Sequence, residues 1–176
     1  MSAVSELVSK SALTRSSAAF AALVIVVGST AIVAGAWFFQ YVLLIQPCPL
    51  CLEQRKFHYA AIALALIALV AVKTRAPRPL VLGALGAMAL ILLVGAGVAI
   101  YHSGVEWKFW AGPQDCSGPM VNFGNAGSLL EDMDKTSIVR CDQATRYFGV
   151  SLANANIVIS LVLAAVAAWG IRAHRH

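Results

Sequence analysis

The chain has 176 residues; 60% are hydrophobic, only 12% are charged, and the formal net charge is +5. Because soluble domains are about one quarter charged, this composition excludes an ordinary soluble domain and indicates a membrane protein surrounded by lipid. The basic residues lie at the ends of apolar segments and not in one patch, so we expect no nucleic-acid partner.

Three long segments contain no Asp, Glu, Lys or Arg: residues 16–52, 80–101 and 147–171. Each can cross a hydrocarbon core of about 30 Å as a helix. A shorter apolar run, Phe57–Val72, can also cross if its flanking basic side chains reach the headgroups and its helix begins near Pro49. We therefore predict an all-α membrane protein, a four-transmembrane-helix bundle in a single domain of residues 1–176. The expected spans are about 18–39, 50–72, 80–101 and 149–171, with outward loops at about 40–49 and 102–148.

Basic residues are distributed asymmetrically about these spans. Seven lie before the first span, between the second and third, or after the fourth, where Glu6 is the single acid. The loop from His102 to Arg146 instead contains four basic and six acidic residues. By the positive-inside rule, we expect both termini in the cytoplasm and the two outward loops on the opposite side of the membrane.

The first span also has features of a cleaved signal peptide: a basic start, an apolar stretch and the small residues Ala34–Ala36. The apolar run continues through Trp37–Phe39, however, which is typical of an interfacial aromatic anchor. We interpret the segment as a retained span. An intact mass that begins at Ala36 or Trp37 would contradict this interpretation.

All four cysteines lie on the predicted outer side, where disulfides persist. Cys48-Pro49-Leu50-Cys51 begins the second span, and a tight CxxC disulfide is generally more reducible than a structural one. The helix N-terminus favours a thiolate near Cys51. Arg55 follows one turn later on the same face, where its charge would stabilise that thiolate or a reduced, anionic acceptor. The pattern predicts a redox-active pair at the outer membrane surface.

The other two cysteines, Cys116 and Cys141, are 25 residues apart in a loop rich in Gly, Asn and Ser. We expect this loop to be mobile, exposed and suited to meeting another protein. Between them, Ser128-Leu129-Leu130-Glu131 has the capping-box pattern and predicts a short helix lying on the membrane.

Two alternatives for the cysteines involve no redox chemistry. A structural zinc site usually needs two close cysteine pairs or cysteine–histidine spacings, and only one close pair is present, so we expect no metal. Two inert structural disulfides remain an alternative, although a CxxC loop is too short to be a good bridge. Covalent haem attachment is excluded because Leu52, and not histidine, follows Cys51.

Two histidines lie close to the first cysteine pair in the predicted arrangement. His102 ends the third span at about the depth of Arg55, and it is either a partner for a bound electron carrier or an interfacial histidine in water. His58 lies two turns below the cysteine pair. We interpret it as a satisfied group between helices, like Asn154 and Asn156 at the start of the fourth span.

Four motifs resemble the disulfide bond formation protein B (DsbB) family, over nearly the whole chain. They are Cys48-Pro-Leu-Cys51-Leu-Glu-Gln-Arg55, Tyr101-His102, Trp110-Ala-Gly-Pro-Gln-Asp-Cys116 and Arg140-Cys141-Asp142. A CxxC alone is a weak signal. The combination here is a strong signal. It joins a CxxC, an arginine four residues later, four predicted spans and a second cysteine pair in a later outward loop.

The resemblance implies a quinone-dependent protein thiol:disulfide oxidoreductase that reoxidises a periplasmic, thioredoxin-like oxidase of the DsbA type. It implies that the partner attacks a Cys116–Cys141 disulfide at Cys116, and that Cys141 then attacks Cys48. Cys51 would leave as a thiolate beside the quinone, either ubiquinone or menaquinone, and reduce it.

By the same resemblance, Arg55 and His102 would bind the quinone. Pro49 and the acidic run Glu131–Asp134 depart from the family's pattern, and they leave open whether the partner is a general or a dedicated oxidase.

Three rival functions make different demands on the sequence. An enzyme of the vitamin K epoxide reductase type has its loop pair before the CxxC, whereas here the CxxC comes first. A transmembrane reductant carrier needs cysteines within spans and reachable from the cytoplasm, whereas all four lie in predicted outward loops. A structural subunit with inert disulfides predicts that Cys51→Ser leaves periplasmic oxidation unchanged.

Overall fold

The computed structural model describes residues 2–113, 116, 140–142, 146–147 and 149–175. Helix α1 (Ser2–Trp37) continues into a π-helical turn, η1 (Phe38–Val42), and is followed by α2 (Pro49–Lys73) and α3 (Arg78–Glu106). Two short antiparallel strands, β1 (Arg146–Tyr147) and β2 (Val150–Ser151), precede α5 (Leu152–Arg175). Among the described residues, four helices are long and apolar enough to cross a membrane, which confirms the predicted all-α, four-span fold.

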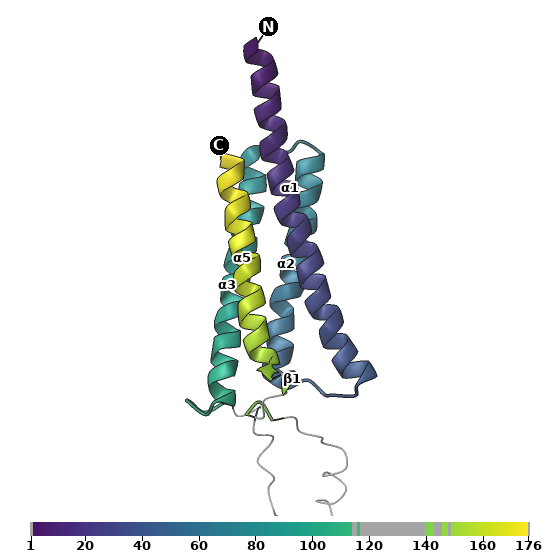
Figure 1. The fold of residues 1–176 in the computed structure, drawn as a ribbon, viewed down its shortest axis with the longest axis vertical. Helices are drawn as coiled ribbons and strands as arrows, with labels where there is room; N and C mark the ends of the chain where they lie inside the picture. The colour runs from purple at the N-terminus through teal and green to yellow at the C-terminus, as the bar shows by residue number, and fades with distance from the viewer. Residues whose placement is uncertain (1, 114–115, 117–139, 143–145, 148, 176) are drawn as a thin grey trace, which may run out of the picture.

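The four long helices form a bundle in which α1 and α3 occupy opposite corners. Each of these two packs against both α2 and α5, and the two barely contact one another. Figure 1 shows both chain termini at one end of the bundle and β1 at the other. We call these the termini end and the cysteine end. Toward the cysteine end, α1 leans away from the other helices (Figure 1).

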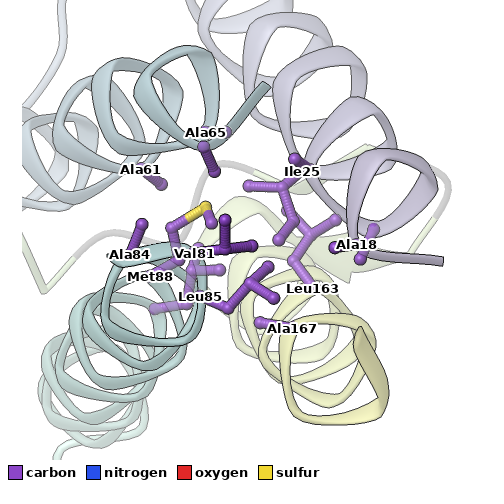
Figure 2. Close-up of a cluster of buried hydrophobic side chains, with 14 of the residues drawn as sticks. Ala18, Ile25, Ala61, Ala65, Val81, Ala84, Leu85, Met88, Leu163 and Ala167 are labelled. Atoms are coloured by element: carbon purple, nitrogen blue, oxygen red, sulfur yellow. The ribbon is translucent and has the colours of Figure 1, made fainter. Parts of the chain in front are cut away.

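Alanine dominates the buried core. Ala61, Ala65 and Ala68 follow one face of α2 and are at most 1% exposed. In lipid, helices associate mainly through close packing, and small side chains permit a close approach. Leu85 and Met88 of α3 fill the space between the helices (Figure 2).

One crossing of α1 and α5 requires glycine. A Cβ atom added at Gly170 would lie 2.7 Å from the Cβ of Ala21. On the outside of the bundle, large apolar side chains such as Leu66 and Val70 are exposed. This arrangement suits a helix bundle that is surrounded by hydrocarbon.

Candidate redox site

The start of α2 shapes the first cysteine pair. Pro49 lies in the first turn, where its missing N–H costs no hydrogen bond, and Cys48 is the N-cap residue. Cys48 Sγ accepts a hydrogen bond from the backbone N–H of Cys51 at 3.2 Å. The two sulfur atoms lie 2.7 Å apart, and both cysteines are free. The local sequence therefore brings two thiols together at a helix N-terminus.

Cys48 is buried, and Cys51 is half-buried. The pKa of the Cys48 thiol is raised well above its ordinary value, mainly by the hydrogen bond between its side chain and that of Cys51 and secondly by burial, which disfavours the thiolate. The thiol form of Cys48 is therefore favoured over the thiolate. A step that turns it into a nucleophile needs a base.

The second pair, Cys116 and Cys141, forms a disulfide. Both residues are buried, at 4% and 1% exposure, in one cluster with Cys48, Leu50 and Val105. The expectation of an exposed loop is therefore wrong at these two positions, because the disulfide packs against the ends of α2 and α3. The predicted helix at 128–131 lies outside the described residues. The cluster brings the two cysteine pairs together at the cysteine end.

An ion pair flanks Cys141. Arg140 donates hydrogen bonds from Nε and Nη2 to the Asp142 carboxylate at 2.9 Å and 2.8 Å. The bonds from Arg140 lower the pKa of the Asp142 carboxyl. Because both side chains are substantially exposed, solvent screening makes the pair weak.

His102 lies between the first cysteine pair and the surrounding polar groups. Its Nε2 is 3.6 Å from Cys48 Sγ, and its Nδ1 is 2.7 Å from Gln54 Nε2. Glu106, one turn later on α3, places a carboxylate oxygen 3.8 Å from Nε2 and accepts a hydrogen bond from the Ser151 hydroxyl. His102 is only 3% exposed, so the alternative of an interfacial histidine in water is wrong.

A chain of side-chain hydrogen bonds extends from His102 into the bundle. Asn156 Nδ2 donates to Gln54 Oε1 at 2.6 Å, and Asn156 Oδ1 lies 2.8 Å from His58 Nε2. The other nitrogen of His58 lies 3.4 Å from the Ser29 hydroxyl. His58 is thus a satisfied group between helices, as predicted, and the network connects all four long helices.

Arg55 connects α2 to the end of α1. Its guanidinium donates to Gln40 Oε1 at 2.6 Å and to the Ala36 carbonyl at 3.2 Å. These acceptors lie on either side of the point where α1 becomes η1. These bonds fix the guanidinium at the end of α1, and Arg55 lines the same cavity as Cys51.

The cavity has a volume of about 220 Å³, lies at the cysteine end and is lined by residues of α1, η1, α2, α3 and α5. One wall is apolar and comes from α1 and η1, whereas the other carries the reactive and polar groups. The apolar wall includes Ala31, Ile32, Gly35 and Phe39; the polar wall includes Cys48, Cys51, Gln54, Arg55, His58, His102, Glu106 and Asn156.

Metal binding is a further possibility for donor atoms this close. One ligand atom each from Cys48, Cys51 and His102 lies within 4.8 Å of the others. Two thiolates on one tetrahedral zinc, at Zn–S of about 2.3 Å, would be about 3.8 Å apart. The sulfur atoms are 2.7 Å apart, which suits thiol–disulfide chemistry better than a preformed zinc site.

Sequence reasoning missed two residues of this site, Gln54 and Glu106. Gln54 is neutral and lies inside the CxxC motif region, three residues after Cys51, so it shares a helix face with the pair. Glu106 was counted among the loop acids, although it is one helical turn after His102 and belongs to α3. Helical spacing from known site residues was the available signal.

A membrane-spanning helix bundle that packs a CxxC pair of free thiols against a buried disulfide defines the class: a membrane protein of thiol–disulfide chemistry. A family model described as Disulfide bond formation protein DsbB matches residues 18–170, nearly the whole chain. The chain belongs to the DsbB family of membrane disulfide-forming proteins, which implies disulfide oxidoreductase activity. No curated protein and no solved structure gives a significant match.

Proposed function

We propose that this protein reoxidises a DsbA-like thiol oxidase of the bacterial periplasm and passes the electrons to a quinone in the inner membrane. The observation that carries the proposal is the packing of the two cysteine pairs in one cluster, where Cys48, Cys116 and Cys141 are buried and Cys51 is half-buried and lines the adjacent cavity. In this arrangement, successive thiol–disulfide exchanges can connect a soluble partner to an acceptor dissolved in lipid.

In the proposed cycle, a thiolate of the reduced partner attacks Cys116, breaks the Cys116–Cys141 bond and frees Cys141 as a thiolate. Cys141 attacks Cys48 of the oxidised first pair, and Cys51 leaves as a thiolate at the cavity wall. The partner's second thiolate then releases Cys116, and the partner departs oxidised. Cys116 attacks Cys141, which restores the outer disulfide and frees Cys48. The net result is one disulfide gained by the partner and one lost between Cys48 and Cys51.

The cavity fits a quinone head group in size and in lining. An engineered apolar cavity of about 150 Å³ binds benzene, so about 220 Å³ accommodates one substituted six-membered ring. When bound, a quinone supplies an acceptor for two electrons and two protons. Arg55 would hold a quinone oxygen, because its guanidinium is held at the end of α1 and the residue lines the same cavity as Cys51, and His102 is a second candidate ligand. The apolar wall from α1 would orient the ring and exclude water.

We further propose that the cysteine end faces the periplasm and that both termini are cytoplasmic. Lys73, Arg75 and Arg78 lie in or beside the turn between α2 and α3, at the same end of the bundle as the termini (Figure 1). This concentration of basic residues at one end supports the orientation.

The test uses the purified protein with a reduced thioredoxin-like oxidase and either ubiquinone or menaquinone, followed by quinone absorbance. We expect quinone to disappear in proportion to the partner thiols oxidised. Cys116→Ser together with Cys141→Ser should stop this partner-driven reaction. Absence of quinone consumption would support a structural subunit with inert disulfides and would overturn the proposal.

A further inference from the structure

His102 contacts the cysteine that has no obvious way to lose its proton. Its Nε2 lies 3.6 Å from Cys48 Sγ, and both side chains are buried. For the Cys48–Cys51 disulfide to form again, the Cys48 thiol must give up a proton, and its raised pKa makes that loss unfavourable without a base.

Several titratable or charged groups share the cavity with His102. They are Cys48, Cys51, Arg55, His58, Glu106 and Arg140. Arginine cannot accept a proton. His58 is engaged with Ser29 and Asn156, deeper in the bundle. Cys51 lies closer to Cys48, at 2.7 Å between the sulfur atoms, but it is the other half of the disulfide to be formed. Outside the pair, His102 is the base whose contact with the sulfur of Cys48 is observed.

Gln54 holds the other nitrogen of the imidazole, Nδ1, through a hydrogen bond. Gln54 can be the donor or the acceptor in this bond. With Gln54 Nε2 donating to Nδ1, the ring proton lies on Nε2 and points toward Cys48. If the carboxamides of Gln54 and Asn156 both rotate by half a turn, Gln54 Oε1 accepts from Nδ1–H, and the lone pair of Nε2 faces Cys48. His58 and the Ser29 hydroxyl can each donate or accept. The hydrogen bonds from Gln54 through Asn156 and His58 to Ser29 are therefore kept in both arrangements.

We propose that His102 is the catalytic base for Cys48, that Gln54 positions its imidazole, and that Glu106 is the countercharge for the imidazolium. The inference rests on the proposed function. In the step concerned, the Cys48 S–H proton moves to His102 Nε2, and the Cys48–Cys51 bond forms between two thiolates. The two electrons would pass to a bound quinone, which would take up one proton from His102 and one from solvent. The Glu106 carboxylate, 3.8 Å from Nε2, stabilises the resulting cation. The arrangement has the nucleophile, base and amide orienter of a Cys–His–Asn site.

The experiment measures the pH dependence of Cys48 reactivity without quinone or partner. In protein carrying Cys51→Ser, Cys116→Ser and Cys141→Ser, Cys48 is the single thiol, and its alkylation by iodoacetamide is followed from acidic to alkaline pH. We expect a reactive component at lower pH, from a thiolate–imidazolium pair. His102→Gln should remove it and slow alkylation near neutral pH by about tenfold or more. Gln54→Met and Glu106→Gln should weaken the same component.

His174→Gln, a buried histidine at the termini end, is the matched control and should leave the profile unchanged. If His102→Gln opens the site, alkylation will accelerate at every pH, so the position of the inflection decides the result. An unmoved inflection overturns the proposal. If the inflection is unmoved but the apparent KM for quinone rises, His102 is a quinone ligand instead. If the protein fails to reduce quinone but the alkylation profile shifts as expected, the proposed function is contradicted. The role of His102 toward Cys48 is then still supported, because alkylation is measured without quinone.

Discussion

The two ends of the bundle differ in what they bury. Toward the termini end, the core is built from alanines and a few large apolar side chains, such as Leu85 and Met88. At the cysteine end, Cys48, Cys116, Cys141 and a chain of polar side chains are buried, and a cavity lined by the half-buried Cys51 lies beside α1. Polar groups inside a membrane protein are costly and frequently functional. The comparison indicates that packing in one half supports a reactive site in the other, so substitutions in the two halves should separate stability from activity.

The largest effect is expected at the cysteine end, from Cys51→Ser. Loss of the Cys51 thiol removes one half of the redox pair and should lower quinone reduction by at least about a thousandfold, since the hydroxyl is far less reactive than a thiolate. The thermal unfolding midpoint should change little. Leu52→Ala, at the exposed neighbouring position, is the control and should keep its activity. Substantial turnover in Cys51→Ser would remove the functional distinction between the two ends.

Arg55→Ala should raise the apparent KM for quinone by roughly tenfold to a hundredfold, which corresponds to loss of one charged hydrogen bond. The rate of exchange with the reduced partner should change much less. Steady-state kinetics with quinone and partner varied in turn separate the two effects. Lys56→Ala removes an exposed cation that pairs with Glu53, and it should alter neither. If Arg55→Ala impaired the reaction with quinone and the exchange with the partner equally, the role assigned to Arg55 would be contradicted.

In the alanine-rich half, Gly170→Ala should cost stability and spare chemistry. The new methyl would meet Ala21 at 2.7 Å, an overpacking that costs about 1–3 kcal/mol. Gly86→Ala is the matched control, because a Cβ atom there meets nothing within 4 Å. We expect Gly86→Ala to be neutral or stabilising by up to about 1 kcal/mol. Reversible unfolding in mixed micelles measures the stability of both variants. A loss of activity per folded molecule in Gly170→Ala would contradict the separation of stability from activity between the two ends.

The smallest effect is expected from Asp142→Asn. Because Arg140 lowers the pKa of the Asp142 carboxyl, this pair stabilises the fold above the carboxyl's unfolded pKa of about 4. That contribution is lost as the pH falls through the lower folded value. Since the pair is exposed, the variant should lower the unfolding midpoint only slightly near neutral pH and not at all in strong acid. If the difference in unfolding midpoint between the wild-type protein and Asp142→Asn grew as the pH fell, the assigned role of the ion pair would be contradicted.

Local features of the sequence predicted much of this molecule. The four spans follow from long uncharged segments, and the geometry of Cys48 and Cys51 follows from a CxxC with proline at a helix start. The burial of Cys116 and Cys141 did not follow, because a Gly-rich loop sequence carries no signal of the helix ends against which it packs. Helical spacing places Gln54 near Cys51 and Glu106 near His102, but it does not reveal their contacts with other elements. Gln54 of α2 contacts α3 and α5, and Glu106 of α3 contacts β2.

The central claim is that the reduced first pair gives its electrons to a quinone at the cavity wall. A single-turnover measurement tests it directly, with Cys116→Ser/Cys141→Ser protein whose first pair is reduced, ubiquinone, and no partner. Quinone absorbance and free thiols are followed together. We predict one quinone reduced for each Cys48–Cys51 pair, with the loss of both thiols at the same rate. Quinone reduction that leaves the thiols free, or that proceeds unchanged after Cys51→Ser, would contradict the claim.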